Sequence, residues 1–165
     1  MPAWLLLACI VLAEISPIGR GLAAAQFRAD DWITECQGGG PGAGCSIIMP
    51  FQPTSARGAT GSFALAVDIE SGVAALVGRP APLAARLQID KNQPLGCTGP
   101  RYCLFAAGGA SSAASQLAAG SIALIDIATK AGDFHASLST KGYRAGLAKI
   151  RAWSYPPIGR GRPVR

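Results

Sequence analysis

Apolar and polar residues alternate along much of the chain, which is typical of β-strands with one buried face. The clearest case is Ser62–Ile69, where Phe63, Leu65, Val67 and Ile69 occupy every second position. Similar short segments recur between Gly- and Pro-rich turns, as in antiparallel sheets. The pattern predicts strands over Trp32–Cys36, Cys45–Phe51, Ser62–Ile69, Val73–Val77, Arg86–Asp90, Tyr102–Phe105, Ser121–Ile127 and Asp133–Leu138.

Two later segments have a helical pattern instead. Ser111–Ala119 is rich in Ala and is followed by Gly120, a residue type common at helix C-termini. Within Gly142–Ala152, Leu147 and Ile150 share one helical face. We expect two short helices that cap the ends of the sheets. The stretch from 26 to 31, before the first strand, is expected to be a polar lead-in.

The composition favours the same fold class. Gly (21) and Pro (12) make up 33 of the 165 residues, and both residue types destabilise helix interiors, so a helical bundle is disfavoured. Charged residues reach only 15% and hydrophobic residues 50%, which excludes a wholly disordered chain. We therefore predict one all-β, mainly antiparallel domain, a small β-sandwich or barrel with one or two short helices.

The N-terminal segment has the features of a secretory signal. Leu5–Ala13 is a continuous apolar run that is too short to span a bilayer. Ala23 and Ala25 then occupy the small-residue positions of a cleavage site. We predict a signal peptide over 1–25, a β domain over 26–153 and a disordered basic tail over 154–165. Lipidation at Cys9 and an uncleaved anchor are the alternatives.

Cleavage after Ala25 would leave four cysteines, Cys36, Cys45, Cys97 and Cys103. An even number in an exported chain favours disulfides, and four cysteines allow three pairings. We favour Cys36–Cys45 and Cys97–Cys103, because each pair closes a short Gly- and Pro-rich loop. A zinc site fits less well, since zinc-binding cysteine pairs are usually two to four residues apart. Free thiols are the third option.

The charge distribution singles out the C-terminal part of the chain. The net charge is +6, and no acidic residue follows the first of seven late cations. Such a segment can bind anionic membranes or envelope polymers, or it can remain a solvated tail that aids solubility. Nucleic acid is not expected, because the chain is predicted to be exported and lacks an aromatic stacking platform. The seven cations are Lys141, Arg144, Lys149, Arg151, Arg160, Arg162 and Arg165.

The chain offers few residues for catalysis or cofactor binding. His135 is the single histidine, and its strand pattern places it on a polar face with Ser137, where a triad built from one strand has poor geometry. Gly38–Gly42 lacks the Lys and flanking helix of a phosphate loop. Asp30 and Asp31 do not have the spacing of a calcium loop. We expect no catalytic residue, no metal and no cofactor.

Several segments, together with the four cysteines, carry a resemblance to a known family. They are Trp32–Cys36, Cys45–Ile48, Leu87–Asp90, Gly96–Cys97, Tyr102–Leu104, Leu117–Gly120 and Ser137–Leu147, the last with a Lys-Gly-aromatic turn. This order resembles the invasion-associated locus B family, small exported proteins of alphaproteobacteria with a β-sandwich-like domain. The resemblance covers about residues 32–150; the Gly-rich 38–44 and the segment 57–61 depart from it.

The resemblance implies a periplasmic or surface role without catalytic residues, and some family members are linked to host-cell invasion or envelope integrity. We expect an exported, non-enzymatic protein that binds an envelope or host protein, or an anionic envelope surface, with peripheral membrane contact as one option. The alternatives are an envelope hydrolase with an unrecognised site and a periplasmic assembly or chaperone-like factor that uses free sheet edges. The identity of the partner and the oligomeric state stay open.

Overall fold

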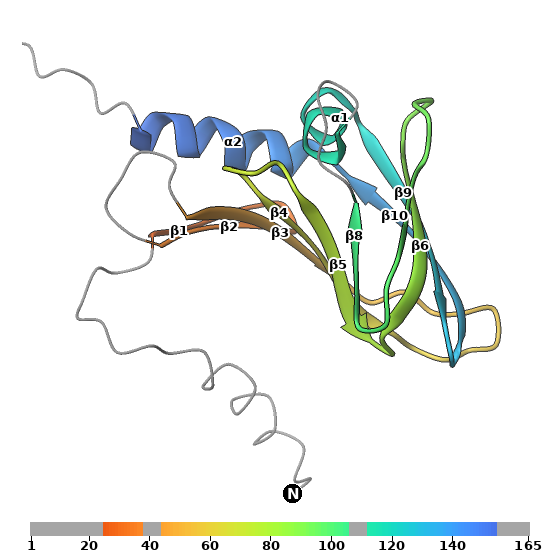
Figure 1. The fold of residues 1–165 in the computed structure, drawn as a ribbon. Helices are drawn as coiled ribbons and strands as arrows, with labels where there is room; N and C mark the ends of the chain where they lie inside the picture. Colours follow the sequence, from red (N-terminus) through yellow and green to blue (C-terminus); the bar gives the residue numbers. More distant parts are fainter. Residues whose placement is uncertain (1–24, 38–43, 106–111, 155–165) are drawn as a thin grey trace, which may run out of the picture.

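The computed structural model describes residues 25–37, 44–105 and 112–154, which form two antiparallel sheets and two helices (Figure 1). Every strand pairing is antiparallel, as the alternating pattern predicts. The first sheet contains, in spatial order, β1 (Ala25–Ala29), β2 (Trp32–Cys36), β3 (Cys45–Phe51), β4 (Ser62–Asp68), β5 (Ala74–Arg79) and β8 (Tyr102–Phe105). The second contains β10 (Gly132–Ser139), β9 (Ile122–Thr129), β6 (Pro82–Ile89) and β7 (Leu95–Thr98).

The core lies between the two sheets, as in a β-sandwich. Alternate side chains of the strands point inward and are almost fully buried, among them Leu65, Leu76, Leu87 and Ile125. Phe63 of β4 and the ring of Phe134 in β10 meet edge to face across the two layers, with centroids 5.3 Å apart. The predicted fold class, an antiparallel all-β sandwich with two helices, is confirmed.

The six-stranded sheet is wider than its partner, and helix α2 (Lys141–Ser154) covers the part of its inner face that the second sheet leaves open (Figure 1). Tyr143 of α2 packs edge to face on Trp32 of β2, with ring centroids 5.3 Å apart. The Trp32 indole N–H donates a hydrogen bond of 2.6 Å to the backbone carbonyl of Ser139. The helix therefore completes the core as a third layer.

Helix α1 (Ala113–Ala119) begins and ends with the residues that the sequence indicates. The Ser112 hydroxyl accepts a hydrogen bond from the Ser115 backbone N–H at its N-terminus, as an N-cap does. At the other end, the Gly120 N–H donates to the Gln116 carbonyl. The predicted helix is confirmed for 113–119.

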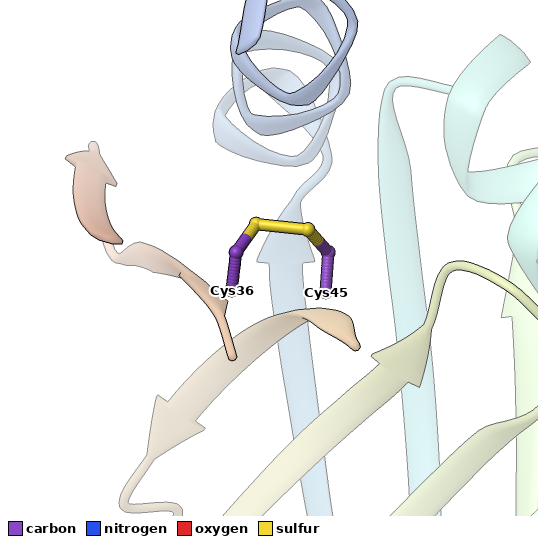
Figure 2. Close-up of a disulfide and its surroundings, with 2 residues drawn as sticks. All are labelled: Cys36 and Cys45. Atoms are coloured by element: carbon purple, nitrogen blue, oxygen red, sulfur yellow. A yellow bond between two sulfur atoms is a disulfide. The ribbon is translucent and has the colours of Figure 1, made fainter. Parts of the chain in front are cut away.

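Both predicted disulfides are present. Cys36–Cys45 joins β2 and β3 at directly paired positions, next to the hairpin loop (Figure 2). Cys97–Cys103 joins β7 to β8, so it links the two sheets covalently. One disulfide therefore closes a hairpin, and the other connects the layers of the sandwich.

Some predicted element boundaries are wrong. The expected polar lead-in is instead strand β1, followed by a two-residue turn in which Asp30 has φ of 51°. Asp tolerates this left-handed conformation better than most residues, so Asp30–Asp31 can replace a Gly-containing hairpin turn. Strand β6 starts at Pro82, four residues before the predicted start at Arg86. Proline is compatible with this position, since the first residue of a strand need not donate a ladder hydrogen bond.

The second helix also differs from expectation. α2 spans 14 residues, Lys141–Ser154, and is longer at both ends than the short helix predicted within Gly142–Ala152. It lies across the inner face of β1, β2 and β3, where the sequence predicts only a cap at a sheet end. Residues 1–24 of the predicted signal peptide (1–25), the loop Gly38–Ala43 and the tail beyond Ser154 lie outside the described residues, whereas Ala25 is the first residue of β1.

Candidate functional site

The outer face of the four-stranded sheet carries a row of three ionisable side chains. Strand register places Arg86 of β6, Asp126 of β9 and His135 of β10 side by side on this face. His135 Nδ1 lies 2.7 Å from Asp126 Oδ1, a distance that fits a hydrogen bond or, when the imidazole is protonated, an ion pair. The two side chains are 68% and 56% exposed, so water reaches both.

Shallow hollows surround this row. One of them measures about 400 Å³ and is lined by Arg86, Asp126, Asp133 and His135, with a floor of alanine and isoleucine from β6 and β9. A second hollow of about 330 Å³ adjoins it at the β9–β10 turn, where Lys130 lies. Their small floor residues and mixed charges give a surface that a partner with both acidic and basic groups can contact.

The sequence places His135 correctly on a polar strand face but gives no sign of its partner. Asp126 becomes its neighbour through the tight β9–β10 hairpin, which pairs Thr129 with Gly132 and leaves two residues in the turn. A hairpin search around Gly132 could have found this pair, because a two-residue turn fixes the register. Within the part of the chain that the structure describes, Asp126 is the hydrogen-bond partner of His135, and no hydroxyl group is.

The predicted cationic residues divide into two groups. Four of them, Lys141, Arg144, Lys149 and Arg151, lie on α2 and are exposed. The other three, Arg160, Arg162 and Arg165, lie outside the described residues. On the helix, the Arg144 guanidinium donates to the Gly120 carbonyl, 2.8 Å away. The Lys149 ammonium lies 5.7 Å from the Phe27 ring centroid and 5.5 Å from that of Trp153.

Arg144 and Lys149 therefore contact other parts of the protein. Lys141 and Arg151 are the α2 cations whose charged groups have no such described contact and are exposed to solvent. Among described side chains, the ion pair is that of Asp126 with His135, so none of the α2 cations is neutralised by a described carboxylate. The four α2 cations lie on the exposed side of a helix whose opposite side is buried. We define the basic strip as Lys141, Arg144, Lys149 and Arg151.

Residues 25–37, 44–105 and 112–154 contain no group of three or more His, Cys, Asp or Glu side chains placed to hold a metal ion. None of the helices in these segments has the length and apolar character needed to cross a bilayer.

These features define a disulfide-linked antiparallel β-sandwich whose wider sheet is completed by a C-terminal helix. A solved structure with a similar architecture is invasion associated protein B from Bartonella henselae, with a TM-score of 0.51. The alignment covers 78% of this chain and 96% of that chain, at 14% sequence identity. The likeness establishes a common fold, as the sequence resemblance predicts. No family model matches the sequence. No curated protein matches it either.

Proposed function

We propose that this protein is an exported, non-enzymatic binding protein of the bacterial envelope, acting in the periplasm or at the cell surface. The observation that carries the proposal is the pair of disulfides, Cys36–Cys45 and Cys97–Cys103, because such bonds persist in oxidising compartments and are rare in the cytosol. The fold shared with invasion associated protein B supports the same assignment.

Cell fractionation combined with mass spectrometry tests the compartment. We expect the protein in the periplasmic or surface fraction, with an N-terminus near Gln26 and no free thiol before reduction. The controls are the same protein after reduction, which should show four thiols, and a variant without residues 2–25. Recovery of the wild type in the cytosol with all five of its cysteines as free thiols would contradict the proposal.

The basic strip supports an anionic envelope surface as the partner. Lys141 and Arg151 keep their charge exposed, and each cation close to an anionic membrane contributes about 1 kcal/mol of attraction. The C-terminal cations Arg160, Arg162 and Arg165 follow on the same chain and would add to this charge. The resulting attraction should weaken as salt screens it.

Adsorption to vesicles with and without an anionic lipid tests this surface. The double variant Lys141→Ala/Arg151→Ala, and separately a chain ending at Ser154, should each adsorb less to anionic vesicles at low salt, about fivefold or more for the double variant. The matched control is Arg57→Ala/Lys130→Ala, which removes two exposed cations beside the β9–β10 turn. Equal adsorption of all four proteins would refute a role for these cations.

An envelope hydrolase is the second candidate, and one observation favours it: Asp126 lies where it could orient His135 as a base. Ser137 is the hydroxyl two positions further along β10, and its side chain makes no described hydrogen bond to His135. A hydrolase of this kind would lose its turnover in His135→Ala. Ester or amide hydrolysis by the purified wild type that is absent from that variant would favour the enzyme.

A further inference from the structure

The outer faces of the two sheets differ in where their charged side chains lie. The four-stranded sheet carries Arg86, Asp126 and His135 in one row across its strands, beside the exposed apolar residues Ile122 and Leu124. The outward positions of β2, β3, β4, β5 and β8 in the six-stranded sheet are apolar over two neighbouring rows, and Arg28 of β1 ends the first row beside Ile33. One row contains Ile33, Ile48, Ala66, Ala75 and Leu104, and the next contains Pro50, Ala64, Val77 and Tyr102. We call these nine residues the apolar band.

The apolar band is exposed in this chain. Val77 is 42% exposed, Tyr102 53% and Leu104 49%, and they are adjacent on β5 and β8. Helix α2 packs on the opposite, inner face of the sheet, and no described helix or strand packs over the band (Figure 1). Continuous apolar surfaces of this kind on a soluble domain mark contact sites.

Charged side chains border the band on opposite sides along the strands. The row before it carries Glu35 and Asp68, and the row after it carries Arg79 paired with Ser62. The Ser71 hydroxyl and backbone N–H both donate to Asp68 Oδ1, and these bonds lower the pKa of the Asp68 carboxyl. The band therefore has an acidic border and a basic border.

We propose that the apolar band is the contact face of a homodimer whose two-fold axis runs parallel to the rows. This rotation reverses the strand direction, so the acidic border of one copy lies against the basic border of the other. Asp68 then comes close to the partner's Arg79, and the two rows of the band bury each other. A second copy is the favoured partner because the acidic border of the band is complementary in charge to the basic border of an identical band.

The size of the face suits a weak dimer. Six strands about 4.8 Å apart and four to seven residues long, at about 3.4 Å per residue, cover about 550 Å². A standard protein interface buries about 800 Å² per partner, and weak, transient interfaces bury less than about 600 Å². Two twisted sheets also pack readily face to face, as the layers of a sandwich do.

Sedimentation velocity of the purified, disulfide-bonded protein over a wide concentration range tests the proposal. We expect the mass to rise toward that of two chains, and Val77→Arg to weaken association about tenfold or more, because each dimer would bury two unpaired guanidinium groups. The matched control is Leu124→Arg, at a 46% exposed position on the outer face of the other sheet. An unchanged circular dichroism spectrum and melting temperature for both variants would show that the fold is intact.

A second pair of variants tests the orientation. Arg79→Glu places like charges at the paired borders and should weaken association, whereas Arg86→Glu on the other sheet should not. A wild type that stays monomeric at every concentration, or equal effects of Val77→Arg and Leu124→Arg, would overturn the proposal. Loss of association in Val77→Arg but not in Arg79→Glu would overturn the proposed two-fold arrangement. A monomer that uses the band to bind a different envelope protein would also overturn it.

Discussion

At the scale of single residues, Trp32 shows how one side chain holds several elements together. It points inward from β2 and is 1% exposed, so its indole N–H needs a partner inside the protein. Ser139 at the end of β10 supplies the carbonyl, and Tyr143 at the start of α2 supplies the ring contact. The two sheets and the helix therefore meet at this residue.

Tyr143 should make the stability depend on alkaline pH. Burial raises the pKa of its hydroxyl from 10.0 to about 12, so the folded protein keeps the proton after the unfolded chain has lost it. Below pH 10 both states are protonated, and Tyr143 adds no pH dependence. Between pH 10 and about 12 the free energy of unfolding should fall by about 2 kcal/mol.

Urea unfolding at about pH 9 and about pH 11 measures the first part of this loss, about 1.4 kcal/mol. Tyr143→Phe should remove most of the loss between the two pH values, since phenylalanine does not ionise. Tyr102→Phe, at an exposed position on β8, is the control and should leave the loss unchanged. The same pH dependence in Tyr143→Phe and wild type would contradict the assignment to Tyr143.

At the scale of elements, α2 lies close to the first sheet because two glycines lie one helical turn apart. A Cβ atom at Gly142 would lie 2.7 Å from Trp32 Cδ1 and would overlap the Ala29 carbonyl. At Gly146 it would overlap the Thr34 hydroxyl and lie 3.1 Å from Ile47 Cδ1. Both glycines therefore set the distance between helix and sheet.

Gly146→Ala should destabilise the protein, although alanine is normally better than glycine in a helix by about 1 kcal/mol. The overlap with β2 and β3 should outweigh that preference and cost about 1–3 kcal/mol. Thermal or urea unfolding provides the measurement. Gly96→Ala is the control, because a Cβ there meets no atom within 4 Å. A more stable Gly146→Ala protein would show that α2 packs less tightly than described.

The elements that the sequence predicts best are those with a long, regular pattern. β4 was recognisable from its four alternating apolar residues, and α1 from its alanines and Gly120. β1 and β7 are strands of five and four residues at sheet edges. Each contains too few buried apolar side chains to show a clear alternation in the sequence. The Asp126–His135 pair required the strand register, which depends on the hairpin turn and not on either residue.

At the scale of the whole molecule, the disulfides have different structural roles. Cys36–Cys45 connects two strands that are already hydrogen-bonded neighbours, while Cys97–Cys103 connects the edge of one sheet to the edge of the other. The spacing along the chain predicted both pairings. It did not predict that the second would join the layers, because sheet membership depends on contacts between distant segments.

Removing Cys97–Cys103 should lower stability. In the chain-entropy model a loop of this length contributes about 2–3 kcal/mol, so Cys97→Ala/Cys103→Ala should unfold at a lower urea concentration than wild type. Cys36→Ala/Cys45→Ala should lose a similar amount, since its loop is only slightly longer. Wild type measured in reductant is the reference for losing both. Identical unfolding of wild type with and without reductant would contradict this expectation.

The position of α2 also constrains the order in which the molecule can assemble. The earliest strands, β1 to β3, are covered by the last element of the fold, through residues such as Tyr143 and Ile150. When a polypeptide emerges from a ribosome or a translocation channel with its N-terminus first, Trp32 and Ile47 stay exposed to water until nearly the whole chain has appeared. The packing of α2 on β1 to β3 is therefore a late step that follows emergence of the chain. A nascent chain stalled before Lys141 would expose the hydrophobic inner face of these strands to chaperones that bind unfolded chains.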